Sequence, residues 1–257
     1  MKLPLKILLL SGFIALLVSS LLRAQGTLFQ SLNLSTGLVA EWKLCGDTSA
    51  SSGCNASNAT AVYDSSGNGN NGSWSGTAAG STGYYSAGHA GPWAGYFNAA
   101  NDSISVNAAS SINLSGSMTI TAWIKTATTV RTSIVVGGYS GSQGYGFGIG
   151  AWNCTPSVGN LAFLAGGTWH CSTATVNDGN WHLIAVSLVS GSSINFYIDG
   201  ALSQTNAYTS GIAAYAGNVG IGYEPGNPYF PGQIEDVRIY DRPLSAPEIA
   251  ALAHAHN

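Results

Sequence analysis

The feature that most constrains this chain is the frequent recurrence of turn residues. Short apolar or alternating runs are separated by clusters of turn residues along most of its length. The 34 glycines, with many Asn, Ser and Asp neighbours, supply those turns. In Met118–Lys125 the even-numbered positions are apolar and would share one face of a strand, while the odd-numbered ones face the other way. Such a pattern predicts many short β-strands in place of a helical or α/β fold.

We expect strands at Leu38–Leu44, Ala94–Asn98, Ser103–Val106, Met118–Lys125, His182–Val189, Ile194–Asp199 and Ile234–Tyr240. The stretch Gly144–Gly150 has glycine at every second place, so one face of that strand is bare and other groups can approach it closely. Only the C-terminus predicts a helix, with Ser245 as cap and Glu248 completing a capping box. The predicted fold is all-β: a two-sheet antiparallel β-sandwich of the jelly-roll, concanavalin A-like type, with one short C-terminal helix.

The N-terminus has the pattern of a secretory signal peptide. Lys2 and Lys6 precede an apolar segment at 7–22, and Ala24 marks a cleavage point. We therefore divide the chain into a signal peptide (1–24), a lead-in segment (25–37) and one domain (38–257). The prediction is a secreted or extracellular protein (periplasmic if the source is bacterial) with no membrane span after cleavage, the alternative being an uncleaved membrane anchor.

Charge argues against one class of partner. Removal of the signal peptide takes away three of the eight basic residues, which leaves five against eleven acidic ones. Nucleic-acid binding requires basic side chains that neutralise phosphates. We therefore expect no nucleic-acid partner.

The four cysteines of an exported chain suggest disulfides, and four cysteines allow three pairings. We favour the two local pairs, Cys45 with Cys54 and Cys154 with Cys171, each closing a loop between strands. A zinc site is disfavoured because the sequence has no C-x-x-C motif.

Three segments, taken together and in order, resemble the laminin-G-like, concanavalin A-like jelly-roll family. They are Leu38–Trp42 followed by Val62–Gly72; Asp178–Val186 with Phe196–Gly200; and Phe230–Ser245 with the helix after it. The resemblance spans roughly residues 38–253 and implies the sandwich fold. It says little about function, because this fold hosts lectins, adhesion modules and hydrolases alike.

A cation loop is predicted at Asp64–Asn70, where Asp64, Asn68 and backbone carbonyls could supply the hard oxygens that calcium prefers. The resemblance implies that an acid from the strand Ile234–Tyr240 completes this site. Glu235 and Asp236 would point to opposite faces of that strand unless it has a bulge, and Glu235 is the favoured ligand. The alternative is an ordinary Asn/Gly turn without metal.

A glycoside hydrolase is the rival interpretation, since related sandwiches include glucanases. A retaining mechanism needs two carboxyl groups about 5–5.5 Å apart. The chain has only four glutamates, and no run places two of them at alternate positions of one strand. We therefore predict no catalytic residues.

Aromatic residues in or near connections are the remaining clue, because sugar rings stack on aromatic faces. The candidates for ligand contact are Trp74, Tyr85, Tyr139, Trp152 and Trp169, with Tyr223 and Tyr229 also in connections. The predicted function is a non-catalytic secreted recognition module that binds carbohydrate and carries a structural calcium ion. Its partner would be a glycan, or alternatively a cell-surface or extracellular protein in an adhesion or structural role.

Overall fold

The computed structural model describes residues 32–44, 60–80, 84–140 and 143–255, with the side chains of 138–140 excepted. Residues 32–36 belong to a separate unit and form part of a short turn, and everything from Gly37 onward forms one compact unit. The predicted signal peptide and the predicted pair of Cys45 and Cys54 lie outside the described residues. No helix among the residues described is both long and apolar enough to cross a membrane.

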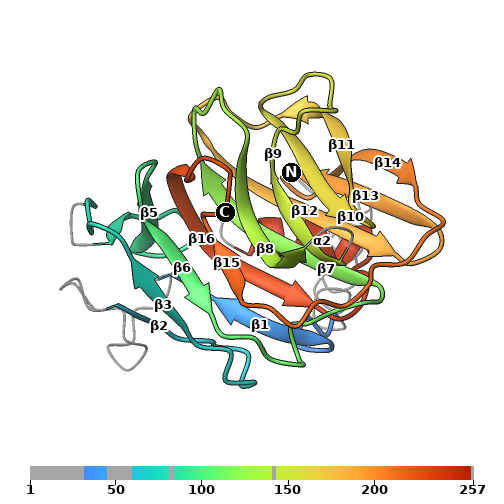
Figure 1. Ribbon diagram of the computed structural model, residues 1–257, viewed down its shortest axis with the longest axis horizontal. Helices are drawn as coiled ribbons and strands as arrows, with labels where there is room; N and C mark the ends of the chain where they lie inside the picture. The colour runs from blue at the N-terminus through green and yellow to red at the C-terminus, as the bar shows by residue number, and fades with distance from the viewer. Residues whose placement is uncertain (1–31, 45–59, 81–83, 141–142, 256–257) are drawn as a thin grey trace, which may run out of the picture. The chain divides into compact units, whose positions relative to one another are not determined.

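Two antiparallel sheets make up the unit (Figure 1). The first sheet has the order β14 (Ala201–Ala207), β13 (Ser193–Ile198), β12 (Trp181–Val189), β7 (Met118–Lys125), β16 (Pro231–Tyr240), β5 (Trp93–Asn98) and β4 (Tyr85–Ala87), with β1 (Leu38–Trp42) also paired to β16. The second sheet has the order β11 (Thr168–Thr175), β10 (Asn160–Ala165), β9 (Gln143–Ile149), β8 (Thr132–Ser140), β15 (Val219–Ile221), β6 (Ser103–Val106), β3 (Gly72–Ser75) and β2 (Ala61–Val62).

The core lies between the two sheets and follows from the alternation of side chains along each strand. From β7, Met118, Ile120, Ala122 and Ile124 all enter the core, as their even spacing predicted. On the second sheet, the odd-numbered residues of β9 from Tyr145 onward and those of β10 enter it in the same way, with Phe147 and Phe163 fully buried. The all-β sandwich predicted from the sequence is therefore confirmed.

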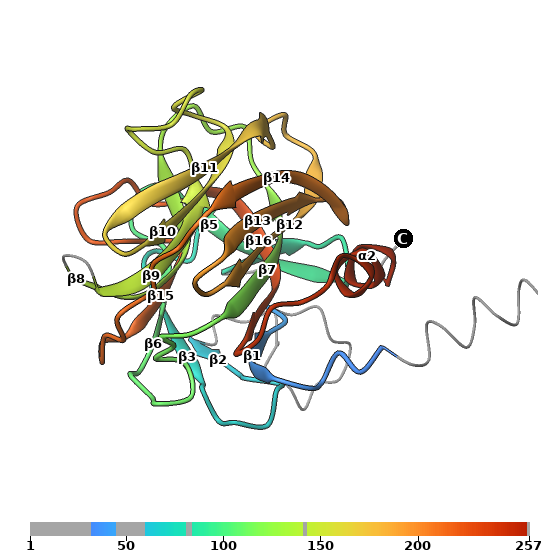
Figure 2. The ribbon, with the colours of Figure 1, turned by 90° about the vertical axis from the view of Figure 1, so that its right-hand side faces the viewer.

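The outer face of the first sheet is also covered. The helix α2 (Ala246–His254) lies against it, on the side of the sheet away from β8, β9 and β15 (Figure 2). Its N-terminus has the predicted capping contact, since the Glu248 carboxylate accepts hydrogen bonds from the backbone N–H and the hydroxyl of Ser245, at 2.8 and 2.7 Å. Coverage on both faces explains why β12 is almost entirely apolar.

A bulge in β16 decides which way two acidic residues face. The pairing of β16 with β7 shifts register between Glu235 and Arg238, and Asp236 adopts a positive φ of 49°. The extra residue places Glu235 and Arg238 opposite the outward-facing Trp123 and Thr121 of β7, while Val237 turns into the core. The exception allowed in the sequence-based prediction, a bulge that inserts one unpaired residue, is therefore present in this strand.

Candidate functional site

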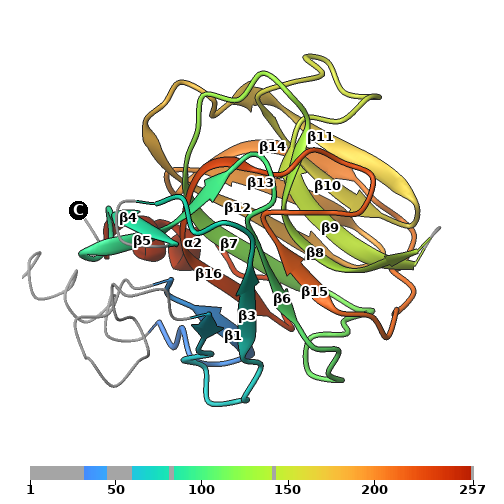
Figure 3. The same cartoon turned by 60° about the vertical axis from the view of Figure 1, so that its left-hand side comes forward.

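Several positions on the outer face of the second sheet carry small residues, among them Ser73, Ser105, Gly220 and Gly146. A row of paired residues crosses seven neighbouring strands: Ser73, Ser105, Gly220, Val136, Gly146, Leu164 and Trp169. The strands β3, β6, β15, β8, β9, β10 and β11 lie in this order in Figure 3. Short side chains leave room above the sheet, which is what a ligand lying against it requires.

A cleft of about 610 Å³ opens above β6, β15 and β8. Its floor includes Ser103, Ser105 and Gly220, and its walls come from two segments that flank β15. The first wall segment supplies Tyr215, Gly217 and Asn218, and the second supplies Tyr223, Glu224 and Pro225. Aromatic rings, hydroxyls, an amide and a carboxylate therefore converge over a floor of small residues, the composition of a small-ligand site.

The second wall belongs to the loop 222–230, whose ends are joined. The N–H of Gly222 donates to Ile134 of β8 at 2.9 Å, and the N–H of Phe230 donates to the Gly222 carbonyl at 2.8 Å. Gly222 has a φ of +78°, and a Cβ there would lie 2.3 Å from the ring of Phe97, so only glycine fits. Tyr223 stacks on Tyr229 across the loop, with ring centroids 4.1 Å apart. These contacts hold Tyr223 and Glu224 in place before any ligand arrives.

Glu224 is the charged group of the cleft. Its side chain is 4% exposed, and one carboxylate oxygen, Oε2, accepts a hydrogen bond of 2.6 Å from the hydroxyl of Ser133 on β8. The loop also approaches β15 closely, since a Cβ on Gly220 would lie 2.8 Å from the carbonyl oxygen of Tyr223. The sequence therefore folds this glutamate back over the sheet, where its second oxygen, Oε1, can accept from a ligand.

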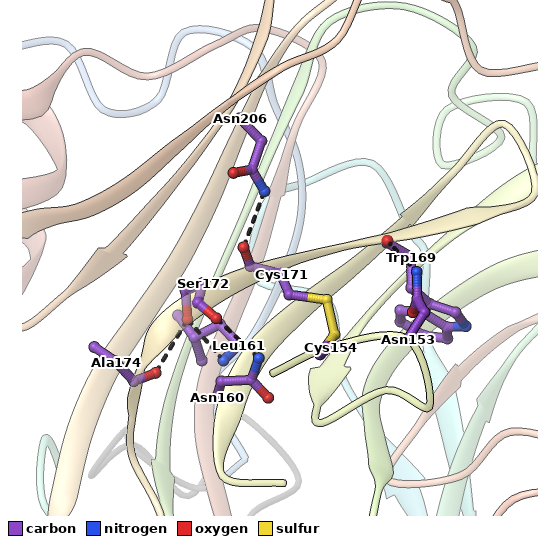
Figure 4. Close-up of a disulfide and its surroundings, with 9 residues drawn as sticks. All are labelled: Asn153, Cys154, Asn160, Leu161, Trp169, Cys171, Ser172, Ala174 and Asn206. Carbon is purple, nitrogen blue, oxygen red and sulfur yellow. Dashed lines mark hydrogen bonds between the residues drawn. A yellow bond between two sulfur atoms is a disulfide. The ribbon is translucent and has the colours of Figure 1, made fainter. Parts of the chain in front are cut away.

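A disulfide fixes another segment on the same face (Figure 4). The predicted bond between Cys154 and Cys171 is present, with the two Cα atoms 5.8 Å apart, and it packs with Ala151, Ala162 and Trp169. Asn153 donates a hydrogen bond of 3.0 Å to the carbonyl of Trp169. The segment 151–154 is thereby tied to β11 at both Asn153 and Cys154.

Trp169 and Trp152 differ in how available they are. The Trp169 ring lies over Gly146, whose added Cβ would meet it at 3.4 Å, so this indole covers the predicted bare glycine face at that position. Trp152 is 75% exposed beside the disulfide. Both remain candidates for ligand contact, with Trp152 offering the larger free surface.

The structure moves two other predicted contacts into the core. Trp74 and Tyr85 are 4% and 3% exposed, and the indole N–H of Trp74 donates to the Tyr85 hydroxyl at 2.9 Å. Trp74 also stacks on Tyr84 with ring centroids 4.8 Å apart. Neither predicted ring has a face to offer a ligand, because the sandwich end closes over both. The side chain of Tyr139, the fifth predicted contact, lies outside the described part of the structure.

Asp64, the centre of the predicted cation loop, has both carboxylate oxygens in use. Its Oδ1 accepts from the N–H groups of Glu41 and Ser66, and its Oδ2 accepts from the Ser66 hydroxyl and the Asn70 N–H, each at 2.9 Å. Asn68 donates from its side-chain nitrogen to the Leu38 and Val39 carbonyls, both at 3.1 Å. The loop therefore joins the 64–70 turn to β1 through hydrogen bonds within the chain.

The two predicted strand acids serve other partners. The Oε2 of Glu235 accepts from the N–H groups of His89 and Ala90, at 2.8 and 3.0 Å, and burial of this carboxyl raises its pKa despite those hydrogen bonds. The carboxylate of Asp236 pairs with Arg238 at 2.9 Å, and Arg238 also pairs with Glu41 at 3.0 Å. Burial raises the pKa of Glu41 in this network.

These placements do not gather the predicted metal ligands. Within the described residues, no group of three or more His, Cys, Asp or Glu side chains is positioned to hold a metal ion. Around Asp64 the groups that point at the carboxylate are N–H and O–H donors, whereas calcium needs six to eight oxygens directed at one point. The loop as folded does not fit calcium, and the ion remains a prediction from the sequence.

A further ionic contact lies in the motif Asp178–Val186. The His182 ring is within 2.8 Å of Asp199 through Nδ1 and within 3.1 Å of Asp178 through Nε2. Burial of the ring opposes protonation, but the hydrogen bonds to the two carboxylates outweigh it and raise the pKa of His182. This histidine therefore links the 178–180 turn to the β13–β14 hairpin.

Sequence reasoning did not select the residues that line the cleft. Tyr223 was recognised only as one aromatic among several in connections, and Glu224 only as one of four glutamates. The available signal was the cluster Gly222-Tyr-Glu-Pro-Gly-Asn-Pro-Tyr229, a turn-rich loop with two aromatics around one acid. Ser103 and Ser105 could have been predicted to share one face of their strand, but not to lie beside that loop.

Comparison with known proteins agrees with this architecture. Residues 98–250 match a laminin G-type model of the concanavalin A-like lectin/glucanases superfamily. The chain belongs to this superfamily. A search of curated proteins finds no match.

Among solved structures, domain 4 of AbnA, a GH43 extracellular arabinanase from Geobacillus stearothermophilus, is similar with a TM-score of 0.63 and 20% identity. The similarity covers 84% of this chain and 98% of that domain, which was solved in complex with arabinotriose. The binding domain of Paraclostridial Mosquitocidal Protein 1 has a TM-score of 0.63 and 19% identity, covering 87% of this chain and 53% of that one. A structure of botulinum neurotoxin type C, whose cell entry depends on two ganglioside molecules, has a TM-score of 0.61 and 14% identity, covering 88% and 52%. This chain thus spans about half of those two toxin chains.

Proposed function

We propose that this protein is a non-catalytic carbohydrate-binding module and that the cleft above β6, β15 and β8 is its binding site. The observation that supports this most is the lining of the cleft, where tyrosine rings and polar groups converge over a floor of serine and glycine. Sugar rings present apolar C–H faces and a rim of hydroxyls, and this lining offers a partner for each. The similar domain of the arabinanase, solved with arabinotriose, suggests a first probe.

The acid content of the cleft supports binding without hydrolysis. Glu224 is the one carboxylate among the described residues that line it. A retaining mechanism requires two carboxyl groups about 5–5.5 Å apart, and an inverting mechanism about 6.5–9.5 Å. A single acid can accept hydrogen bonds from a sugar but cannot supply both the acid and the base or nucleophile.

We also propose that the protein acts outside the cytoplasm. The disulfide between Cys154 and Cys171 supports this, because such bonds persist mainly in oxidising compartments. The apolar segment at 7–22, with its two lysines before it, is the second argument. A tagged full-length chain recovered from the cell exterior with residues 1–24 removed would agree with both. Retention inside the cell with an intact N-terminus would contradict them.

Binding is tested by titrating arabinotriose and a panel of neutral oligosaccharides into the disulfide-intact protein, followed by calorimetry. Tyr223→Ala removes a ring from the cleft wall and should weaken binding of whichever sugar is retained by about tenfold or more, since each 1.4 kcal/mol is a factor of ten. Tyr63→Ala is the matched control, because Tyr63 is 47% exposed and does not line the cleft. Binding that is equal in both variants would place the site elsewhere.

The rival function is recognition of a protein, as the sequence left open. Capture of a defined extracellular protein partner, together with failure of every sugar in the panel, would overturn the carbohydrate proposal. Release of reducing ends from a polysaccharide by the wild-type chain would overturn the non-catalytic part.

A further inference from the structure

Glu224 is unusual among the acids of this chain because it is nearly buried and yet lines a cleft. Only 4% of its surface is exposed, and Oε2 is held by the Ser133 hydroxyl at 2.6 Å. No described protein group donates to Oε1. This oxygen is open to the cleft, since it is not among the described buried polar atoms that lack a partner, and it takes its donor from outside the protein. In an open cleft that donor is water or a ligand hydroxyl.

The charges around the cleft do not offset this carboxylate. Of the described residues that line it, none is Lys, Arg or His. The neighbouring polar groups are neutral: Ser103, Ser105, Asn218 and the two tyrosines. The cleft therefore presents a net negative charge, concentrated on one rigidly held group.

Rigidity adds to this effect. The backbone N–H of Asn227 donates to the Glu224 carbonyl at 3.0 Å, and the ends of the loop are joined through Gly222 and Phe230. The carboxylate therefore cannot swing into solvent without breaking its bond to Ser133 and moving the loop. A ligand therefore has to bind next to a negative charge whose position is fixed.

We infer that Glu224 determines ligand class: it accepts hydrogen bonds from hydroxyls of a neutral sugar and excludes sugars that carry a carboxylate. The inference rests on the proposed function and deepens it, since it names the kind of glycan that the same cleft takes. A carboxylate is an acceptor only, so it matches a sugar hydroxyl. A uronic acid placed in the cleft would bring a second negative charge within several ångströms in a partly desolvated site, where like charges repel strongly.

The experiment compares matched probes on the disulfide-intact protein. Neutral oligosaccharides from the panel are paired with uronic acid counterparts of the same ring size and length, and affinities are measured for wild type and for Glu224→Gln. We expect wild type to favour the neutral member by about tenfold or more, given the size of such a repulsion at an intermediate dielectric. In Glu224→Gln, whose amide oxygen can still accept from Ser133, the ratio should fall to within about threefold.

Two additional variants keep the test decisive. Asp241→Asn removes one negative charge from an exposed position outside the cleft and should leave the ratio unchanged. Ser133→Ala keeps the charge and releases its partner, so the preference for neutral sugars should persist even if Glu224→Gln folds poorly. Raising the salt concentration should reduce the discrimination in wild type.

The outcomes separate the two proposals. Equal binding of neutral and acidic probes by wild type, or a ratio unaltered in Glu224→Gln, overturns the inference and leaves the binding cleft standing. Absence of binding to every probe overturns the proposed function and the inference with it. A ratio that falls equally in Asp241→Asn also overturns the inference, because general charge would then explain it.

Discussion

Replacement of Asp64 by alanine tests whether the 64–70 loop is held by hydrogen bonds within the chain. The wild-type carboxylate accepts four of them, two at each oxygen and each of 2.9 Å. A hydrogen bond to a charged group contributes about 1.5–3 kcal/mol net, and part-exposed donors recover a share of this from water. We therefore discount each to somewhat under 1 kcal/mol and expect Asp64→Ala to lower the free energy of unfolding by about 3 kcal/mol.

Asp64→Asn provides an internal calibration. Its single acceptor oxygen can retain the two donors at Oδ1, the N–H groups of Glu41 and Ser66, while its NH2 group cannot accept from the other two. The expected loss is therefore about half, close to 1.5 kcal/mol. Asp241→Ala, at an exposed position, should change the stability by less than about 0.5 kcal/mol.

The assay is urea unfolding of the oxidised protein at neutral pH, supported by calorimetry. For a domain of this size, 3 kcal/mol corresponds to a fall in Tm of about 6–12 °C. Each variant is measured with added calcium and with chelator. If hydrogen bonds hold the loop, the loss in Asp64→Ala is the same in both conditions. A loss below about 0.5 kcal/mol would refute the hydrogen-bond reasoning. Wild-type stability that falls on chelation, with Asp64→Ala unaffected by it, would instead support the predicted calcium site.

Three other predictions follow from the contacts described above. Because the pKa of His182 is raised in the folded protein, its contribution to stability is fully present below the pKa of the unfolded chain, near 6.5, and is lost as the pH rises through the folded value. Wild type should therefore lose stability relative to His182→Gln as the pH rises above about 6.5 in pH-resolved unfolding, and parallel profiles would contradict this. Replacement of Cys154 and Cys171 by serine opens a loop of 17-residue separation and should cost about 3 kcal/mol in urea unfolding; an unchanged midpoint would show that the bond adds no stability. Gly222→Ala forces a side chain against Phe97 at a positive φ, so sugar affinity should fall with the stability of the loop, and unaltered affinity would show that the loop does not shape the site.

Much of the fold could be predicted, because the alternation of apolar and polar residues along a strand shows which of its faces is buried. Alternation in Met118–Lys125 identified both the strand and its core face, and Ser103–Val106 was predicted with its observed bounds. Observed bounds elsewhere differ by a few residues at most, as in β12 and β13. Other strands, among them β8, β10 and β11, were not among those expected from the sequence.

The site was less accessible to sequence reasoning for two physical reasons. The residues next to an aromatic in a turn do not show whether its ring is exposed or packs into the core. Trp74 and Tyr85 were therefore predicted to contact a ligand, although both are buried. Likewise, a bulge at Asp236 has no signature of its own in the strand, yet it decides where Glu235 points. Both outcomes depend on what packs opposite, which a linear pattern does not contain.

The sequence by itself determined the all-β class, the core faces of the alternating strands and the capped C-terminal helix, and it favoured the pairing of Cys154 with Cys171 among three possibilities. Each of these depends on neighbours within a few residues or on one local loop. Tertiary structure alone decided which residues form the cleft, since Ser105 and Glu224 are separated by more than a hundred positions and meet only because β6 and β15 pair in the second sheet. Backbone pairing sets that juxtaposition, and the side chains that line a cleft contribute little to specifying it.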